Sequence, residues 1–226
     1  YKFVKGNITN HKLMGELINE CDIVVNFAAE SFVDKSINDA SPFLISNIMG
    51  THTILDIITK KKKKLIQIST DEVYGSLKNS SATEKSIFNP TNPYAATKAS
   101  AELLVNSYFA TYNSNVIITR CTNNYGPRQF VEKLIPKTII LANQNKKIPI
   151  YGKGNNIRDW IFVDDHCDAI LMSILNGKEG ESYNISANNE IDNITIVKKI
   201  LQLMNKSEEL IEFVEDRPGH DFRYSL

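Results

Sequence analysis

The sequence has no excess of charge of either sign. Its 226 residues carry 26 basic and 26 acidic side chains, so the formal net charge at pH 7 is zero. Proteins that bind nucleic acid or a membrane surface usually carry a basic excess. The lysine run Lys60–Lys64 ends a predicted helix, where cations complement the helix dipole and face solvent. We therefore expect neither a nucleic-acid nor a membrane partner.

Long apolar runs and paired cysteines are also missing. No apolar run approaches the roughly 20 residues that cross a membrane, and the first residues do not form a signal-peptide pattern. The three cysteines, Cys21, Cys121 and Cys167, lack metal-ligand spacing, and two of them lie in or beside apolar runs. Reduced thiols fit this pattern. We therefore expect a cytoplasmic protein without a metal site.

Strand-like and helix-like segments alternate along the first half of the chain. This alternation predicts an α/β fold with a doubly wound parallel sheet. The predicted strands are Lys2–Val4, Asp22–Phe27, Leu65–Ser69 and Val116–Arg120. The predicted helices run from about residue 10 to 19, from Pro42 to about 61, and from Pro93 past Tyr108.

After Cys121 the alternation is less regular. Residues 123–128 have turn chemistry, and they precede a predicted helix at 134–142 and short strands at 148–151 and 160–163. A helix at about 164–175, a strand at 183–185, a helix at 194–204 and a strand at 211–214 follow. We predict a sheet domain over 1–122 plus about 162–180, and a smaller lobe over 123–161 and 181–226. The lobe would cover the carboxyl edge of the sheet, where open α/β sheets bind ligands.

A tyrosine and a lysine share one face of the predicted helix that Pro93 opens. Tyr94 and Lys98 stand four residues apart, so their side chains lie one turn from each other. The ammonium could lower the tyrosine pKa from about 10 and let it take a proton from a sugar hydroxyl. The spacing alone is weak, because it occurs three times in the chain and also suits a half-buried tyrosine beside a solvated lysine.

Two adjacent carboxyl groups follow the buried strand Leu65–Ser69. Adjacent acids usually form a solvated turn, but Asp71 and Glu72 stand where α/β sheets place their sites. Two carboxyl groups in different surroundings can act as one acid and one base. Thr70 adds a hydroxyl that could orient a substrate.

The last residues concentrate cationic side chains around a rigid turn. Arg217, His220 and Arg223 flank Pro218-Gly219. Together with Arg158 they suit a diphosphate, because arginine binds phosphate through two parallel hydrogen bonds. An ordinary charged loop would have the same composition.

Several segments together resemble one enzyme family. The chain resembles nucleotide-sugar 4,6-dehydratases of the extended short-chain dehydrogenase/reductase family, with dTDP-glucose 4,6-dehydratases as the nearest group. The resemblance implies an NAD(P)-binding Rossmann-like sheet with a smaller substrate lobe. The segments that carry it occur in the family's order and are Phe27–Ser31, Val33-Asp34, Ser36-Ile37, Ser69–Gly75, Tyr94–Lys98, Asn123–Pro127, Glu132–Pro136, Pro149–Gly154, Ile157–Trp160 and Asp216–Asp221.

The resemblance implies a dehydration without net redox change and NAD as cofactor. Tyr94, with Thr70, would remove the proton of the sugar C4 hydroxyl while NAD takes the C4 hydride. Lys98 would hold the nicotinamide ribose. Glu72 would then take the C5 proton, Asp71 would protonate the departing C6 hydroxyl, and hydride would return to C6.

The resemblance also assigns ligand contacts by position, and a homodimer. The residues expected to hold the nucleotide sugar are Ser31, Thr70, Asn123, Lys133, Leu134, Pro149, Tyr151, Arg158, Asn193, Arg217 and His220. The residues expected to touch NAD are Asn7, Ile8, Ala28, Ala29, Ser46, Tyr94, Lys98 and Asn124.

The chain departs from the family pattern at its beginning. The glycine-rich turn that holds the NAD pyrophosphate is not among its residues, and residues 1–8 match the family's third strand. Phe32 stands where the family usually has histidine, and Asn7 where it usually has aspartate. The expectation is a fragment that binds NAD poorly, in which Asp22–Phe27 is an unpaired sheet edge.

Other functions remain open from sequence alone. A UDP-glucose 4,6-dehydratase shares these motifs. A UDP-glucuronate decarboxylase or a sugar epimerase is a related alternative, against which the Asp71-Glu72 pair argues. The third alternative is an inactive fragment that binds nucleotide sugar.

Overall fold

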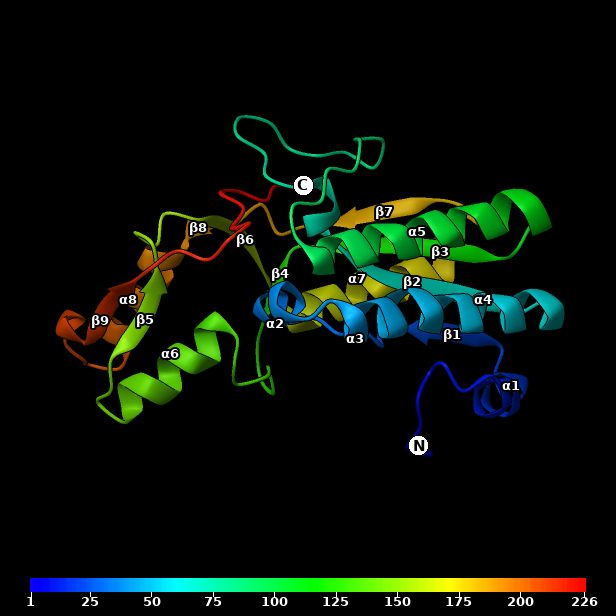
Figure 1. Cartoon of the computed structure of the whole chain (residues 1–226), viewed down its shortest axis with the longest axis horizontal. Coiled ribbons are helices and arrows are strands. Elements are labelled where there is room, and N and C mark those ends of the chain that lie inside the picture. Colours follow the sequence, from blue (N-terminus) through cyan, green and yellow to red (C-terminus); the bar gives the residue numbers. More distant parts are fainter.

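A four-stranded parallel sheet forms the larger of two lobes in the computed structural model, which describes residues 1–226 (Figure 1). Its strand order is β1-β2-β3-β7. These strands are β1 (Ile23–Asn26), β2 (Lys64–Thr70), β3 (Val116–Cys121) and β7 (Ser182–Ile185). Strand β2 lies inside the sheet and is buried along nearly its whole length, as expected for a parallel strand that is covered on both faces. The predicted α/β class is confirmed.

Helices cover both faces of this sheet, with α4 and α5 in front of it and α7 behind it in Figure 1. The main core packs Leu55 and Ile58 of α4 against Leu65, Val116 and Ile118 of the sheet. The helical segments of this lobe are α1 (His11–Asn19), α2 (Val33–Asn38), α3 (Ser41–Phe43), the π-helix η1 (Leu44–Met49), α4 (Gly50–Lys61), the 3₁₀ helix η2 (Asp71–Tyr74), α5 (Pro93–Tyr112) and α7 (Val163–Asn176).

The helix predicted from Pro42 to Lys61 is interrupted by the π-helical turn η1. Within this turn the Asn47 side chain is buried and binds the backbone of Glu30, accepting from its N–H at 2.9 Å and donating to its carbonyl at 3.0 Å. Asn47 also donates to Thr97 Oγ1 of α5 at 3.0 Å. A wider turn at such a point is typical of π-bulges near functional sites.

Strand β1 lies at the edge of the sheet, as the sequence predicted. Phe27, directly after this strand, is 61% exposed. The predicted strand Lys2–Val4 is wrong, because residues 1–6 have no regular structure. A strand needs a neighbour to accept its hydrogen bonds, and no strand of the sheet pairs with this segment.

The smaller lobe contains three short ladders and two helices. Its core packs Ile148 and Ile150 against Ala142, Val197 and Leu201. Strand β6 pairs with β4 in parallel and with β8 in antiparallel orientation, while β5 pairs with β9. The elements are β4 (Asn123–Tyr125), α6 (Leu134–Asn143), β5 (Ile148–Tyr151), β6 (Ile157–Phe162), β8 (Glu190–Asp192), α8 (Asn193–Leu203), the 3₁₀ helix η3 (Glu208–Leu210) and β9 (Ile211–Val214).

Two sequence expectations need correction here. The predicted turn at 123–125 is strand β4, because Trp160 and its neighbours in β6 supply a ladder partner. Residues 182–185, expected in the smaller lobe, form β7 and pair with β3 in the large sheet. The chain therefore crosses between the lobes at α7 and β7 and returns to the smaller lobe through β8.

The last six residues connect the lobes. Tyr224 donates its backbone N–H to the carbonyl of Ile157, while Arg223 and Ser225 accept from Leu77 and Ala82. This tail therefore lies between β6 and the loop over residues 75–91. No helix combines the length and apolar character needed to cross a membrane.

Candidate functional site

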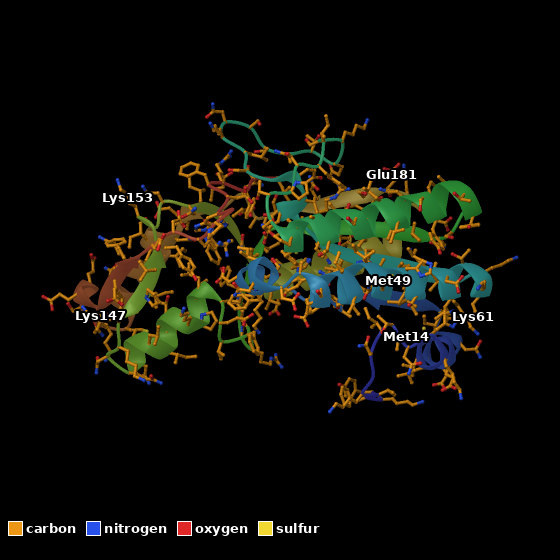
Figure 2. The ribbon with its side chains drawn as sticks, in the orientation of Figure 1. Met14, Met49, Lys61, Lys147, Lys153 and Glu181 are labelled. Carbon is orange, nitrogen blue, oxygen red and sulfur yellow. The ribbon has the colours of Figure 1, made fainter.

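A cleft of about 220 Å³ separates the two lobes at the carboxyl ends of β2 and β3. In Figure 2, Lys147 and Lys153 mark the smaller lobe and Lys61 the far end of the larger one, and side chains from both lobes fill the junction. Twelve residues expected to bind substrate or cofactor, or to act in catalysis, line this cleft. They are Ser31, Glu72, Asn123, Asn124, Lys133, Leu134, Pro149, Tyr151, Arg158, Asn193, Arg217 and His220.

The larger lobe contributes Thr70, Asp71, Glu72, Tyr94 and Lys98, which we call the floor. Only Glu72 of these lines the cleft, and the other four are buried behind it. Strand β2 ends at Thr70, and the chain turns at once into the 3₁₀ helix η2. Thr70 caps this turn, because its Oγ1 accepts a hydrogen bond from the backbone N–H of Glu72 at 3.3 Å. The cap fixes the two adjacent carboxyl groups at the sheet edge.

Asp71 is the most buried acid of the floor, with 4% of its surface exposed. Its Oδ1 accepts from Thr70 Oγ1 at 3.2 Å, while its Oδ2 has no partner within the chain. Burial, together with the neighbouring charge of Glu72, raises the pKa of Asp71 to about 8. Asp71 is therefore a protonated acid at neutral pH.

Glu72 differs from its neighbour because it lines the cleft. Its Oε2 accepts from Asn92 Nδ2 at 3.4 Å and lies 3.2 Å from the hydroxyl of Tyr224. Asn92 also caps helix α5 by accepting from Ala95 N at 2.9 Å. Asn92, which caps the helix that carries Tyr94, therefore also orients Glu72. The two carboxyl groups have the contrasting surroundings that the sequence analysis required for one acid and one base.

Tyr94 and Lys98 lie buried on α5, but the predicted lowering of the tyrosine pKa is wrong for this structure. Burial raises the pKa of Tyr94 well above its usual value, and Glu72 raises it further. Lys98 donates to the carbonyl of Ile68 at 2.6 Å, and burial lowers its pKa to about 8. Spacing on the helix predicted the shared face but not these competing partners.

The smaller lobe and the loop before the tail contribute Lys133, Tyr151, Arg158, Arg217 and His220, which we call the wall. Arg217 forms an ion pair with Asp34 across the cleft, with Nη1 and Oδ1 3.0 Å apart. Tyr151 donates to the other oxygen of Asp34 at 3.0 Å, and Lys133 donates to the carbonyl of Ser31 at 3.0 Å.

The remaining wall residues are also held by neighbours. The Arg158 guanidinium lies over the ring of Tyr224, 4.3 Å from its centre, and donates to the backbone carbonyl of Asp221 at 3.0 Å. His220 Nδ1 lies 2.6 Å from Asp216 Oδ1. Burial nevertheless lowers the pKa of His220. The wall is therefore cationic mainly through its arginines and lysine.

Arg223 does not belong to the cleft, although the sequence grouped it with Arg217. Its guanidinium binds both oxygens of Glu190, at 2.6 and 2.7 Å, and the carbonyl of Ser80. Arg223 therefore anchors the tail.

Sequence reasoning missed several lining residues. The side chains of Phe32, Asp34, Gln129, Trp160 and Tyr224 all line the cleft. Asp34 and Trp160 stood inside the motifs that carried the resemblance, but nothing in the motifs gave them a role. Tyr224 follows the arginine-rich turn, and its burial at the cleft depends on a long-range contact with Ile157.

The nicotinamide end of an NAD site fits the residues of the floor. Ala28 and Ala29 follow β1 after Phe27, and Ser46 stands on η1. Ser69 Oγ and Asp71 Oδ2 are buried without partners, and Lys98 has used one of the three donors of its ammonium group. Further away, Ile8 packs against Gly50 of α4, and exposed Asn7 accepts from Thr9.

Comparison with known proteins gives a consistent assignment. The family model described as GDP-mannose 4,6 dehydratase matches residues 1–225. The low-salt glycan biosynthesis protein Agl12 of Haloferax volcanii is 47% identical, over 100% of this chain and 73% of that protein. A dTDP-glucose 4,6-dehydratase of Streptomyces niveus is 42% identical, over 100% of this chain and 68% of that protein.

A solved structure extends the likeness to three dimensions. The dTDP-glucose 4,6-dehydratase DesIV of Streptomyces venezuelae, solved with NAD bound, superposes with a TM-score of 0.98 at 41% identity, over 100% of this chain and 70% of that one. The resemblance expected from the motifs is therefore confirmed, and the chain belongs to the GDP-mannose 4,6 dehydratase family.

Proposed function

We propose that the chain carries out the NAD-dependent dehydration of a nucleoside-diphosphate glucose, dTDP-glucose, to its 4-keto-6-deoxy sugar. The observation that carries this proposal is the pair of adjacent carboxyl groups in opposite surroundings. Asp71 is buried and protonated, whereas Glu72 lines the cleft. An elimination across C5 and C6 needs one group that takes a proton and one that gives a proton.

The floor residues would act in sequence on the sugar. Tyr94 Oη, assisted by Thr70 Oγ1, takes the proton of the C4 hydroxyl. The resulting 4-ketone acidifies C5, and Glu72 removes its proton. Asp71 gives its proton to the departing C6 hydroxyl, which leaves as water. The short spacing between Asp71 and Glu72 on η2 suits two bonded carbons of one sugar, C5 in the ring and C6 outside it.

The nicotinamide end of NAD would be held by Tyr94, Lys98 and Asn124. Room for it would be left by Ala28, Ala29 and Ser46. The adenine end would lie toward Asn7 and Ile8. Bound NAD supplies the hydride acceptor for C4 and the hydride donor for C6, and its positive nicotinamide ring favours the Tyr94 phenolate. Lys98 would add a second positive charge on the same helix face once its ammonium turns from the Ile68 carbonyl.

The wall would bind the diphosphate and the sugar. Arg158 and Arg217 present guanidinium groups, which bind phosphate oxygens in pairs. Arg217 is already paired with Asp34, so a diphosphate would compete with this carboxylate for the same donors. The other proposed substrate contacts all line the cleft, and they are Ser31, Asn123, Lys133, Leu134, Pro149, Tyr151, Asn193 and His220.

A homodimer in the cytoplasm forms part of this proposal. Helices α4 and α5 pack side by side, and α5 exposes Leu103 and Tyr112, each 60% exposed. Because Leu103 and Tyr112 are nine residues apart, they point to opposite sides of α5, and the proposed helical interface rests on the side of Leu103. Sedimentation of the protein and of Leu103→Glu would test it, because a dimer through α5 should dissociate in the variant.

Glu72→Gln tests the central assignment. With dTDP-glucose and NAD, this variant should oxidise C4 but stall before water leaves, so the 4-keto sugar with its C6 hydroxyl should accumulate. The mass and proton spectrum of the sugar would identify it. Glu16→Gln, an exposed acid on α1, is the matched control and should give the 4-keto-6-deoxy product. Full dehydration by Glu72→Gln would contradict the proposal.

A further inference from the structure

The hydroxyl of Tyr224 lies between two carboxyl groups. Its Oη is 2.6 Å from Asp221 Oδ2 and 3.2 Å from Glu72 Oε2. The side chain is almost fully buried, yet it lines the cleft beside Glu72. No other tyrosine hydroxyl of the chain contacts two carboxylates.

One phenol proton cannot serve two ionised carboxylates equally. The shorter distance indicates that Tyr224 donates to Asp221, which leaves its oxygen lone pairs facing Glu72. A protonated Glu72 could donate to that oxygen, whereas an ionised Glu72 could not. The arrangement therefore suits Glu72 best after it has taken a proton. Burial and the charge of Glu72 both raise the pKa of Tyr224, so the phenol keeps its proton at neutral pH.

The contacts continue from Asp221 to the surface. Asp221 Oδ2 also accepts from Thr91 Oγ1 at 2.5 Å, and Thr91 is exposed. The chain of hydrogen-bonding groups thus runs from the cleft through Glu72, Tyr224, Asp221 and Thr91 to solvent. Each link is a group that can both accept and give a proton.

The position of Tyr224 is fixed independently of its hydroxyl. Its ring lies under the Arg158 guanidinium, and its backbone N–H binds the carbonyl of Ile157. Asp221 is held through its backbone carbonyl, which accepts from Asn156 at 3.1 Å. A substitution of tyrosine by phenylalanine therefore removes the hydroxyl and leaves the packing in place.

We propose that Tyr224 and Asp221 form a proton relay that exchanges the proton on Glu72 with solvent. The proposal rests on the proposed function, because it takes Glu72 as the group that removes the C5 proton. Tyr224 acts on the reaction through Glu72, so it is a positioning residue and not a catalytic residue.

The proton and electron balance of the relay is simple. The C5–H bond breaks, its electron pair forms the C5–C6 double bond, and the C6–O bond breaks as the hydroxyl takes the proton of Asp71. Glu72 keeps the C5 proton, and rotation of its carboxyl group brings the O–H against Tyr224 Oη. Tyr224 accepts this proton and gives its own to Asp221, which releases one to water beside Thr91. The reverse path returns a solvent proton to Glu72 and then to C5.

Hydrogen exchange at C5 tests the relay without any redox step. The 4-keto-6-deoxy nucleotide sugar is mixed with the protein in D₂O, and loss of the C5 proton signal is followed by NMR. The wild-type protein should exchange it, Glu72→Gln should not, and Tyr224→Phe and Asp221→Asn should slow it about tenfold or more. Tyr183→Phe removes a hydroxyl that binds Lys178 N outside the cleft and should exchange as the wild type does. Exchange by Tyr224→Phe at the wild-type rate would overturn the relay.

Dehydration of dTDP-glucose in D₂O separates the relay from the function on which it rests. The wild type should place deuterium at C5, and Tyr224→Phe should retain more of the substrate hydrogen there. A merely structural role would lower the rate without changing this retention. If the wild type dehydrates but keeps the C5 hydrogen, the relay alone is wrong. If it does not dehydrate, the proposed function is wrong. Asp221→Asn gives the same readout if Tyr224→Phe does not fold.

Discussion

The floor and the wall of the cleft differ in how their charged groups are satisfied. On the floor, Asp71 Oδ2 and the neighbouring Ser69 Oγ are buried without partners, and Tyr94 is kept neutral by burial. On the wall, Arg158 binds backbone carbonyls, and Arg217 is paired with Asp34 through Nη1, while its Nε is buried without a partner. A buried polar group without a partner costs free energy, and the two such atoms of Ser69 and Asp71 stand at the sheet edge where the proposed reaction would use them.

The difference separates chemistry from binding. The floor stands on the rigid central strand β2 and on helix α5, and its unusual pKa values come from the loss of water. The wall stands on strands β5 and β6 of the smaller lobe and on the loops that carry Lys133, Arg217 and His220, and its partners can be exchanged for a phosphate. We therefore expect substitutions on the floor to affect rate and stability strongly, and substitutions on the wall to affect affinity moderately.

The largest expected effect is that of Tyr94→Phe. Removal of this hydroxyl should lower the rate of C4 oxidation by roughly 10³-fold, within the range of general acid–base catalysis, while binding of the nucleotide sugar stays near wild type. Single-turnover formation of the 4-keto sugar measures the rate, and calorimetry measures binding. Tyr183→Phe is the control. A rate within tenfold of wild type would remove Tyr94 from the floor's chemistry.

Glu102→Gln should strongly lower the free energy of unfolding, because Glu102 supports the elements that carry the floor. Glu102 is fully buried on α5 and pairs with Arg120 of β3, with oxygen–nitrogen distances of 2.9 and 2.7 Å, and Arg120 also binds Tyr74 of η2. Loss of one partner of a buried pair costs about 3–5 kcal/mol.

Urea denaturation would measure this loss in the free energy of unfolding. Glu20→Gln breaks the exposed pair with Lys2 and should cost about 0.5 kcal/mol or less. Equal losses of unfolding free energy in the two variants would show that Arg120 can stay buried without its partner at little cost. The expected difference between the floor and the surface would then be wrong.

Asp71→Asn should change how stability depends on pH. The folded pKa of Asp71, about 8, lies above its usual value of 3.8, so the folded state prefers the protonated acid. Stability from this group is full below about pH 4, falls as pH rises and the unfolded chain ionises, and levels off above the folded pKa of about 8. At pH 7 the asparagine variant should be more stable, on the order of a few kcal/mol.

Denaturation at a series of pH values checks this expectation. The difference in unfolding free energy between variant and wild type should be small at pH 4 and grow toward pH 8. Because other titrating groups are common to both proteins, the difference isolates Asp71. A difference that does not vary with pH would mean that Asp71 is ionised in the fold.

Arg217→Ala should weaken diphosphate binding without a large change in turnover at saturation. Hydrogen bonds to a charged group contribute about 1.5–3 kcal/mol, which corresponds to an affinity loss of roughly 10- to 100-fold. Titration with dTDP followed by calorimetry gives the affinity. Arg217→Lys keeps the charge but loses the paired geometry. Its affinity for dTDP should therefore lie between that of the wild type and that of the alanine variant. Unchanged affinity in the alanine variant would place the diphosphate elsewhere.

The difference between local patterns and long-range contacts explains which features the sequence could predict. Strand β2, helix α5 and the order of Thr70, Asp71 and Glu72 follow from local patterns, and the structure confirms them. The partners of these groups were not predictable, because Ile68, Asn92 and Tyr224 reach them across long sequence separations or through backbone carbonyls. The predicted lowering of the tyrosine pKa failed because burial of Tyr94, together with the charge of Glu72, raises this pKa instead.

The smallest expected effect is that of Asp34→Asn on the wall. Asp34 holds both Arg217 and Tyr151, and its side chain is about a quarter exposed, so solvent screens the ion pair to about 1 kcal/mol or less. The carboxylate competes with a diphosphate for Arg217. Its neutral amide should therefore tighten dTDP binding by a factor of about five or less, and the gain should shrink as salt rises. Calorimetry at low and high salt measures both, with Asp39→Asn on the exposed loop after α2 as the control. Weaker binding in Asp34→Asn would show that Asp34 positions Arg217 for the phosphate, and the wall would then be prearranged like the floor.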